Sequence, residues 1–451
     1  MTDRPDLIVV GAGACGMVGA IAAARRGLRV LLLDKGDEPA GNTVRSTGLI
    51  PAAGTRFQRE AGIEDDSPER MAQDILKKNN HESDPEITRL LCEESGPLVE
   101  WLSDEAGCEM VCFTDFLYPG HSRLRMHGPP TGYGTELAAA LERAVRGEPR
   151  IDLLTGAPAA GLMWDGSRVT GVKTGDGNVE AGAVLLALNG FGANERMVRH
   201  HLGARVADAV YYGSPNNTGE GIVWGADLGA ATEHMGAYQG HASVAFPDGP
   251  LVTWGVVVNG AILINRHGRR FGNEMVGYSE FAAEVMSQPG AEAWEIFDEE
   301  VYEASRDTRL KEVLEAEKVH RFDSLEEMGS VFGLPPEALA ETIEETNRCA
   351  RGAEADPFGR EGFAGGPLET PFFGIHVRGA LFHTQGGLKV DEKARVLREN
   401  GTVVPGLYAG GGTAAGVSGS GHAGYSSGNG LLAAAVLGKV AGEHAATVTV
   451  Q

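Results

Sequence analysis

The first 36 residues constrain the fold of this chain more than any other stretch. Residues 6–36 read DLIVVGAGACGMVGAIAAARRGLRVLLLDKG, which is an apolar run, a glycine turn, an Ala-rich segment, a second apolar run and an acidic end. Gly11 permits a tight strand-to-helix turn, Gly13 lets backbone N–H groups reach a pyrophosphate, and Gly16 allows close helix packing. Asp34 stands where a carboxylate accepts from a ribose hydroxyl. A turn that binds nothing is the alternative, but the flanking runs favour a dinucleotide-binding α/β unit.

Size and charge exclude several kinds of partner. With 451 residues the chain is long enough for two or three structural units. A net charge of −23 argues against nucleic acid, because counterion release needs clustered Lys and Arg. We find no leader-like opening and no apolar run of spanning length, so we expect a cytoplasmic protein without a membrane span. The five cysteines form no CxxC pair, and we expect reduced thiols and no metal site.

The residue pattern changes twice in the middle of the chain. Residues 153–190 alternate in short runs with Asp-Gly turn signals, which predicts a small antiparallel meander. After Gly236 the pattern is mixed, and the acidic stretch Ala291 to Glu317 predicts helices, as does the segment Pro335 to Cys349. We interpret this block as an inserted domain.

The C-terminal part of the chain contains another glycine-rich turn. Residues 405–416, PGLYAGGGTAAG, predict a strand and a glycine turn, and residues 429–446 predict a long Ala-rich helix. Such a turn presents N–H groups and partial positive charge to an anion or a ring oxygen, which suits a reduced flavin. A nicotinamide enzyme predicts no second glycine site of this kind.

Seven blocks together resemble the fumarate reductase and succinate dehydrogenase flavoprotein superfamily, including its 3-ketosteroid dehydrogenase branch. They are the opening fingerprint, GNTVRSTGLIPAAGT (41–55), LNGFGANERM (188–197), TGEG (218–221), AILINRHGRRFGNE (261–274), FHTQGGLKVD (382–391) and PGLYAGGGTAAG (405–416). The resemblance covers almost the whole chain. It implies an α/β fold with a Rossmann-type, GR2-like FAD-binding domain at 1–235 and 381–451, and an inserted α+β capping domain at 236–380. Substrate would be held against the flavin at their junction.

The resemblance also implies FAD as the cofactor. We expect it to be non-covalent, since residues 41–48 contain no histidine to attach it. Most of the expected contacts are backbone and polar groups of the quoted blocks, and two more, Gly428 and Asn429, lie at the start of the predicted C-terminal helix. The whole set is Gly11, Gly13, Ala14, Cys15, Gly16, Asp34, Lys35, Asn42, Thr43, Ser46, Thr47, Gly48, Asn189, Gly190, Asn194, Gly386, Gly411, Gly412, Gly428 and Asn429.

The chain departs from the dicarboxylate-using members of that superfamily. Those members carry an arginine acid and a Glu/Arg proton relay in the cap, and a second arginine near the C-terminus. By block alignment the two arginines fall on Tyr278 and Tyr425, and the relay falls on Trp254 and Val257. Fumarate reduction therefore loses its proton donor. Two family histidines persist as His241 and His383, for which the resemblance implies substrate contact.

Ketosteroid dehydrogenases are similar in placing a tyrosine at both of these positions. Removing two hydrogens beside a ketone needs a base for the α-proton, a donor for the enolate oxygen and an acceptor for the β-hydride. We expect Tyr278 to be the base and Tyr425 the oxygen donor, with Tyr118 assisting the base and the Gly428 N–H sharing the oxygen. A phenol with a pKa of about 10 also needs a neighbour that stabilises phenolate.

The sequence thus predicts an FAD-dependent α,β-dehydrogenase of a ketone-activated, cyclic small molecule, such as 4-oxocyclohexanecarboxylate or a 3-ketosteroid. The main alternative is a fumarate reductase-like or tricarballylate dehydrogenase-like enzyme in which Arg45, Arg123 or His383 holds carboxylate. An electron-transfer subunit and a noncatalytic FAD-binding protein are further alternatives. Oxygen, a quinone and a carrier protein all remain open as the electron acceptor.

Overall fold

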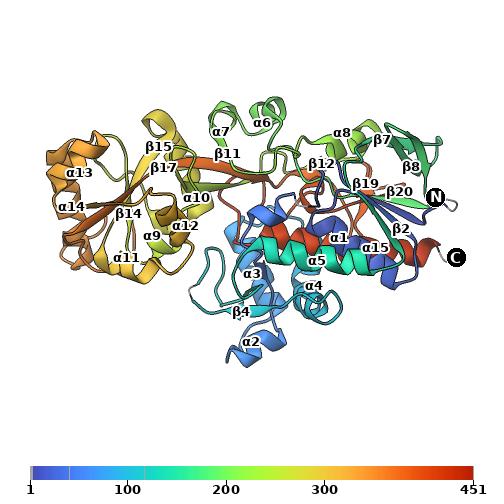
Figure 1. Ribbon diagram of the computed structural model, residues 1–451, viewed down its shortest axis with the longest axis horizontal. Coiled ribbons are helices and arrows are strands. Elements are labelled where there is room, and N and C mark those ends of the chain that lie inside the picture. Colours follow the sequence, from blue (N-terminus) through green and yellow to red (C-terminus); the bar gives the residue numbers. More distant parts are fainter. Residues whose placement is uncertain (1–3, 40, 116, 450–451) are drawn as a thin grey trace. The chain divides into compact units, whose positions relative to one another are not determined.

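The computed structural model describes residues 4–39, 41–115 and 117–449, which form two compact units (Figure 1). Unit 1 comprises Met1–Leu202, Gly213–Tyr238 and His383–Gln451, and unit 2 comprises Gly203–Tyr212 and Gln239–Phe382. The division of roles predicted for residues 1–235, 236–380 and 381–451 stays a proposal.

Unit 1 is built on a six-stranded sheet in the order β19-β20-β10-β1-β2-β6. Its strands are parallel except β19, which pairs antiparallel with β20. Every residue of β1, β2 and β10 is buried, as expected for parallel strands covered on both faces. The strands are β1 (Leu7–Val10), β2 (Val30–Leu33), β6 (Ile151–Leu154), β10 (Ala183–Leu186), β19 (Arg395–Leu397) and β20 (Val403–Ala409). The predicted Rossmann-type α/β core is confirmed.

Three smaller sheets complete the strands of unit 1. The antiparallel meander predicted within residues 153–190 is β7-β8-β9, whereas residues 153–154 and 183–186 of that range belong to β6 and β10 of the six-stranded sheet. The others have the orders β3-β5-β4 and β12-β18. The strands are β3 (Ile50–Pro51), β4 (Val111–Phe113), β5 (Met126–Gly128), β7 (Ala159–Trp164), β8 (Val169–Thr174), β9 (Gly177–Glu180), β12 (Thr232–Glu233) and β18 (Gly387–Leu388).

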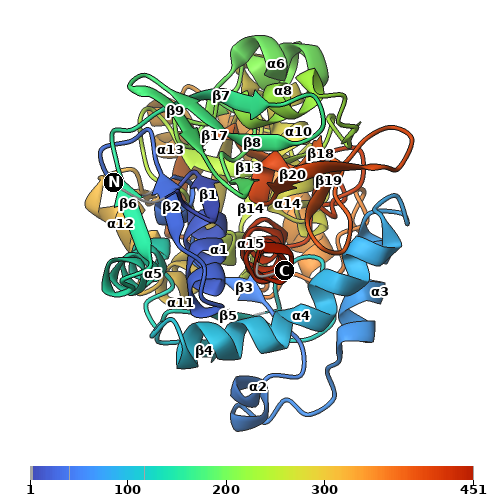
Figure 2. The ribbon, with the colours of Figure 1, turned by 90° about the vertical axis from the view of Figure 1, so that its right-hand side faces the viewer.

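Two helices from opposite ends of the chain pack together in unit 1. Figure 2 shows the blue helix α1 beside the red helix α15. Their backbones approach closely, because a Cβ on Gly438 would collide with the Cys15 carbonyl and one on Gly442 with the Gly19 carbonyl. The helices of unit 1 are α1 (Ala14–Arg25), η1 (Thr43–Arg45), α2 (Arg56–Glu60), α3 (Pro68–Lys78), α4 (Pro85–Asp104), α5 (Gly134–Gly147), α6 (Glu195–His201), α8 (Glu220–Asp227), η4 (Gly411–Thr413) and α15 (Asn429–Thr449).

Helix α15 corrects one expectation from the sequence. Its segment Asn429–Val448 is long and apolar enough to cross a membrane, with a mean hydropathy of 1.3, although the sequence reading found no run of spanning length. Within the protein 56% of that segment is buried. Its hydropathy therefore serves the packing against α1 in unit 1.

Unit 2 has its own mixed sheet. Its path is β11-β17-β15-β14, and β13 and β16 also pair with β17. The chain passes between the units within β13, after Tyr238, and within β17, after Phe382. The strands are β11 (Val210–Tyr211), β13 (Tyr238–Ala245), β14 (Ile262–Ile264), β15 (Glu292–Asp298), β16 (His320–Phe322) and β17 (Phe372–Thr384).

Strand β15 corrects the prediction of helices over residues 291–317. All seven of its residues are buried, and they alternate between two apolar clusters. Ala293 and Phe297 belong to one cluster, and Trp294 and Ile296 to the other. Burial on both faces of the sheet overrides the acidic pattern here. Helices begin only after this strand, with α11.

The helices of unit 2 are interspersed with its strands along the chain. The segment predicted at Pro335 to Cys349 is helix α14, which starts one residue later behind Pro335. The helices are α7 (Ala204–Ala207), α9 (Gly255–Val258), η2 (Glu274–Val276), α10 (Tyr278–Ser287), η3 (Pro289–Ala291), α11 (Glu299–Ser305), α12 (Leu310–Glu315), α13 (Leu325–Phe332) and α14 (Pro336–Ala350).

Candidate active site

The fingerprint turn of unit 1 keeps the start of α1 available to an anion. Gly11 has a φ of +104°, and an added Cβ would collide with the carbonyl oxygen of Ala187, so only glycine fits. Gly13 is the N-cap of α1 and supplies no side-chain cap, and the first turn carries no acidic residue. Thr43 Oγ1 accepts the N–H of Ala14 at 3.0 Å. The partial positive charge of the helix therefore meets no acidic side chain in the first turn.

The charged residues after β2 already have partners in the protein. Asp34 Oδ2 accepts the N–H of Ala12 at 2.6 Å, and its Oδ1 accepts that of Gly36 at 2.8 Å. A carboxylate offers about four acceptor positions, so capacity for a ribose hydroxyl remains. Lys35 Nζ lies 2.6 Å from Glu220 Oε1. Lys35, which the sequence predicts as a cofactor contact, therefore forms an ion pair with Glu220, the acid of the TGEG block.

The segment after the fingerprint is held by its own side chains. Asn42 Oδ1 accepts from Asn217 Nδ2 at 2.9 Å, and Ser46 Oγ accepts the N–H of Gly48 at 3.0 Å. Thr47 is half-buried beside them. These bonds fix the backbone of residues 42–48 near the start of α1, through the link from Thr43 to that helix.

Three glycine turns far apart in the sequence meet in unit 1. Asn189 adopts a φ of +64° after β10, and its Oδ1 accepts the N–H of Gly190 at 2.8 Å. A Cβ on Gly412 would collide with that same Oδ1, and one on Gly411 would lie 3.3 Å from Cys15 Cβ. The fingerprint helix, the turn after β10 and the C-terminal turn therefore form one cluster of close backbone.

Three other predicted cofactor residues have structural contacts. Asn194 caps α6 through Oδ1, and its Nδ2 donates to the Thr218 carbonyl at 3.0 Å. A Cβ on Gly386 would collide with the His234 carbonyl, and one on Gly16 with the backbone of the fingerprint turn. Their contacts to a cofactor stay predictions.

The polar atoms at the start of α15 fit a bound group. Asn429 is fully buried, and within the described part of the chain neither its Oδ1 nor its Nδ2 has a hydrogen-bond partner. Ser426 Oγ is also buried, and it too has no hydrogen-bond partner among the described residues. Leaving such groups unpaired costs about 1–3 kcal/mol each, so a ligand that bonds them is favoured. Together with the open start of α1, these atoms fit FAD.

Tyr425 and His383 form an edge-on pair in unit 1. Their ring centroids lie 5.7 Å apart at 75°. Gln385 Nε2 lies 2.8 Å from His383 Nδ1, and Gln385 Oε1 accepts from Ser418 Oγ at 2.9 Å. The Thr384 carbonyl is farther from Nδ1, at 3.4 Å. The amide therefore donates to Nδ1, and the imidazole proton lies on Nε2. Burial lowers the pKa of His383 to about 4, so the ring is neutral at pH 7.

Tyr118 lies on a loop of unit 1 that is hydrogen-bonded to the loop carrying Tyr425. The Pro119 carbonyl accepts the N–H of Ser427 at 3.0 Å, so this contact spans more than 300 residues of sequence. Gly428 follows with a φ of +80°. The structure brings Tyr118, Tyr425 and Gly428 into one unit, whereas Tyr278, which Tyr118 was expected to assist, belongs to unit 2.

Tyr278 belongs to a column of stacked rings in unit 2. It opens helix α10, and its ring lies parallel to His241 at 4.9 Å and 19°. His241 stacks in turn on Phe382 at 5.3 Å, and Phe382 on Tyr212 at 4.9 Å. Trp254 meets the His241 ring edge-on at 6.0 Å. The sequence reading identified Tyr278 and His241 but missed the rings that hold them.

His241 is a neutral imidazole with a defined tautomer. The N–H of Ser243 donates to its Nδ1 at 3.1 Å, so the ring proton lies on Nε2. Burial, and then the positive charge of Arg309, lower the pKa of His241 to about 3. Ser243 Oγ donates to Glu295 Oε2 at 2.7 Å. Burial raises the pKa of Glu295 to about 8, so a protonated acid lies behind the stack at pH 7.

The positions aligned with the lost proton relay are part of the apolar core of unit 2. Trp254 and Val257 are both buried in the cluster against which Tyr278 packs. Of the arginines considered for carboxylate binding, Arg123 is paired with Asp65 at 2.6 Å, and Arg45 is exposed on η1. Among the described residues, no cluster suits a metal ion, and burial raises the pKa of the Cys15 thiol to about 12.

A Rossmann-type core with three converging glycine turns defines a flavin-dependent oxidoreductase. The chain belongs to the FAD-binding domain family, whose sequence profile matches residues 6–431. FAD is its cofactor, and the protein is an FAD-dependent oxidoreductase of the class that acts on CH–CH bonds.

Known relatives include both fumarate reductases and ketosteroid dehydrogenases. A fumarate reductase (cytochrome) of Shewanella frigidimarina is 31% identical over 98% of this chain and 77% of its own length. The structure of the open conformation of a flavocytochrome c3 fumarate reductase matches with a TM-score of 0.85 and 26% identity, over 100% of this chain and 79% of that one. A 3-ketosteroid-delta4-(5alpha)-dehydrogenase from Rhodococcus jostii RHA1 matches with a TM-score of 0.77 and 26% identity, over 99% and 98%.

Proposed function

We propose that this protein is an FAD-dependent α,β-dehydrogenase of a ketone-activated, cyclic substrate, a small oxo acid or a 3-ketosteroid. The observation that carries the proposal is a tyrosine–histidine pair in each unit, Tyr425 with His383 and Tyr278 with His241. Both tyrosines stand at positions where the block alignment expects arginine in dicarboxylate-using enzymes. Phenols suit the acidity of a carbon beside a ketone, whereas they cannot replace guanidinium groups as charged anchors.

Tyr278 has a suitable neighbour for the role of base. Arg309 places positive potential at His241, the ring on which Tyr278 stacks. The same potential favours a phenolate over a phenol, because an opposite charge stabilises the ionised form. Tyr278 would then remove the α-proton as its phenolate. Bound FAD supplies the acceptor for the β-hydride.

Tyr425 and the Gly428 N–H would act on the ketone oxygen. A hydroxyl and a backbone N–H both donate, and donors aimed at a developing enolate lower the barrier. The two histidines are neutral and carry their proton on Nε2. Such N–H donors suit a second carbonyl or a carboxylate of the substrate, which supports an oxo acid.

The test is an anaerobic screen of the holoenzyme with cyclic ketones, oxo acids and dicarboxylates, followed by loss of the oxidised flavin band. We expect bleaching by cyclic ketones, and formation of a conjugated enone by ultraviolet absorption. Bleaching by succinate alone would overturn the proposal.

A second candidate is a fumarate reductase-like or tricarballylate dehydrogenase-like enzyme. It is favoured by the 31% identity to the fumarate reductase of Shewanella frigidimarina and by the presence of His241 and His383. This candidate predicts that fumarate reoxidises the dithionite-reduced enzyme, whereas a cyclic enone does not. The electron acceptor, a cytoplasmic location and non-covalent attachment of FAD remain parts of the proposal.

A further inference from the structure

His121 lies behind the proposed oxygen donor Gly428. Its Nε2 is 2.8 Å from the carbonyl oxygen of Ser427, and the His121 side chain is only 8% exposed. Because a carbonyl oxygen only accepts, Nε2 carries the proton and donates to it. The other ring nitrogen, Nδ1, is buried and has no hydrogen-bond partner within the described ranges. The ring is therefore held by a single bond with a fixed direction.

That bond fixes the peptide group between Ser427 and Gly428. In a trans peptide the C=O and the following N–H point in opposite directions, so holding the Ser427 carbonyl aims the Gly428 N–H away from His121. Ser427 is held on its other side by its own N–H, which donates to Pro119 at 3.0 Å. A Cβ on Gly428 would lie 2.5 Å from Pro51 Cδ, so this backbone has little room to rotate. A hydrogen bond to the carbonyl also polarises the N–H.

We propose that His121 is a positioning residue that aims and polarises the Gly428 N–H toward the substrate oxygen. The inference rests on the proposed function, because it gives the Gly428 N–H an oxygen to bind. It adds a residue that touches neither the substrate nor the reacting atoms.

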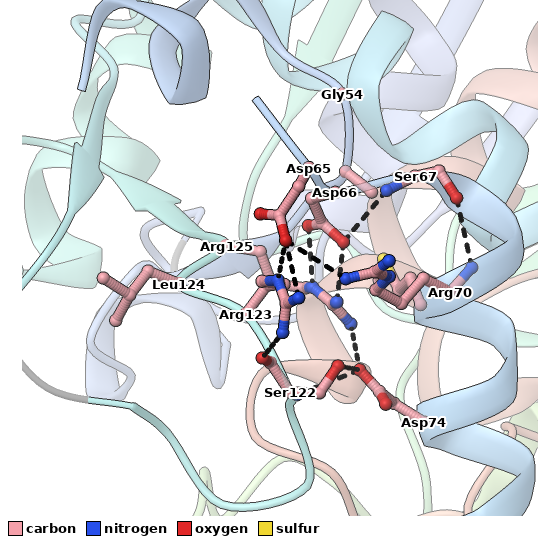
Figure 3. A network of polar contacts seen from close by, with 12 residues as sticks. Gly54, Asp65, Asp66, Ser67, Arg70, Asp74, Ser122, Arg123, Leu124 and Arg125 are labelled. Carbon is pink, nitrogen blue, oxygen red and sulfur yellow. Dashed lines mark hydrogen bonds and ion pairs between the residues drawn. The ribbon is translucent and has the colours of Figure 1, made fainter. Parts of the chain in front are cut away.

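A buried ion network anchors the loop that carries His121. Figure 3 shows the Arg125 guanidinium between Asp66 and Asp74, with bonds of 2.7 and 2.8 Å. Ser122, the next residue after His121, donates to Asp74 through both its N–H and its Oγ, at 3.0 and 2.8 Å. Arg125 is fully buried. The loop is thus tied to α3, which limits its movement relative to the Ser427 peptide.

Burial keeps His121 neutral. Burial, and then the positive charge of Arg125, lower the pKa of His121 to about 4, while Asp74 and Asp66 oppose this effect. A protonated ring would bury a second N–H at Nδ1, where the described residues offer no acceptor. The neutral ring with one donor is the form that the surroundings favour at pH 7.

The test compares three variants of the holoenzyme. His121→Phe removes the donor, and His121→Gln places an amide N–H in reach of the same carbonyl. His127→Gln is the matched control, because His127 is also fully buried in unit 1 and is bonded elsewhere, to Thr55 Oγ1 at 2.8 Å. We measure kcat and KM with a cyclic ketone, the FAD content, and binding of 4-nitrophenolate, an enolate mimic, by its visible absorption.

We expect His121→Phe to lower kcat and 4-nitrophenolate affinity about tenfold, with KM and FAD content unchanged. His121→Gln should recover most of both losses, and the control should lose neither. Wild-type values in His121→Phe, with normal ketone turnover by the wild type, would overturn the inference alone. A wild type that neither oxidises a cyclic ketone nor binds 4-nitrophenolate would overturn both the inference and the proposed function. If kcat falls equally in His127→Gln, the effect is structural and the inference fails.

Discussion

The two units each hold a tyrosine beside a neutral histidine, but in different arrangements. In unit 2 the rings of Tyr278 and His241 are parallel at 19°, and further rings continue the stack. In unit 1 Tyr425 and His383 meet at 75°, among loops rich in backbone N–H groups. A stack fixes a ring and excludes water from its face, whereas loops supply directed donors. Under the proposed function, the residue that removes the proton belongs to unit 2 and the oxygen donors belong to unit 1.

The largest effect is expected from Tyr278→Phe, which removes the base and leaves the stack. The rate of flavin bleaching by substrate should fall about 1000-fold, since a general base contributes on that order. Stopped-flow absorption under anaerobic conditions measures it. Tyr302→Phe is the matched control, because Tyr302 stacks on Phe373 in the core of the same unit. A Tyr278→Phe enzyme that still bleaches rapidly would remove unit 2 from proton transfer.

The equivalent change in unit 1, Tyr425→Phe, should be milder because the Gly428 N–H remains. We expect a loss of about 100-fold in kcat, or about 3 kcal/mol of transition-state stabilisation. Tyr408→Phe is its control, since Tyr408 lies on β20 of the same unit and its hydroxyl bonds His444 of α15 at 2.9 Å. If Tyr425→Phe were as severe as Tyr278→Phe, the division of roles between the units would not hold.

The units should also differ in their response to pH. The folded protein holds the Glu295 proton to about pH 8, whereas the unfolded chain releases it near pH 4.5. Between these values the folded state binds more protons, so the free energy of unfolding falls as pH rises. Glu295→Gln should therefore stabilise the protein by about 4 kcal/mol at pH 8, with no gain below pH 4.5.

Chemical denaturation at a series of pH values checks this prediction. Glu326→Gln is the control, because Glu326 is an exposed carboxyl on α13. Below pH 6.5 buried histidines of both units contribute the opposite slope, since the pKa is lowered to about 4 for His121, His127 and His383 of unit 1 and to about 3 for His241 of unit 2. As pH falls, these histidines take up protons in the unfolded chain before they do so in the folded protein. The free energy of unfolding therefore decreases as pH falls from about 6.5 toward 4. Equal slopes in wild type and Glu295→Gln would contradict a buried, protonated Glu295.

A smaller effect is expected from Arg309→Gln. Without this cation the Tyr278 phenolate is less favoured, so kcat at pH 7 should fall about tenfold and the rising limb of the pH–rate profile should move to higher pH. Arg306→Gln removes the same charge from a more exposed side chain nearby, and should change neither quantity. An unshifted profile in Arg309→Gln would separate Arg309 from the base.

The smallest effect concerns the stack itself. Phe382→Leu keeps an apolar side chain but removes the ring between His241 and Tyr212. A stacked pair contributes about 1 kcal/mol, so we expect a change of severalfold in KM with kcat little altered. Phe373→Leu on the same strand is the control for repacking, and should lower stability without changing KM. If Phe382→Leu abolished turnover, the stack would have a chemical role.

Much of the fold was predictable because its signals are local. The fingerprint turn, the meander β7-β8-β9, and helices α14 and α15 each carry their own glycine, turn or helix pattern. Strand β15 was not, since its acidic residues resemble a helix and only burial on both sides makes it a strand. The hydropathy of α15 was also underestimated, because alanine and glycine dominate its packed face.

The sequence predicted candidate site residues, and the structure adds neighbours that the sequence did not indicate. Motif positions pointed to Tyr278, Tyr425 and both histidines, but ring stacking joins β13, α10 and β17. The bond from His121 to Ser427 spans 306 residues, and no periodicity reports such a contact. Arg309, which we propose as the phenolate-stabilising neighbour that the sequence left unnamed, precedes α12 and is brought to His241 only by folding.

The close approach of α1 and α15 has a consequence for biosynthesis. The fingerprint is translated first, whereas the turn at Gly411–Thr413 and the glycines that let α15 pack against α1 come from the last tenth of the chain. A nascent polypeptide without these residues lacks the C-terminal glycine turn and the Asn429 side chain of the flavin cradle. We therefore expect FAD to bind only after residues 411–449 have been synthesised and folded, and a truncation before residue 429 to yield an apoprotein.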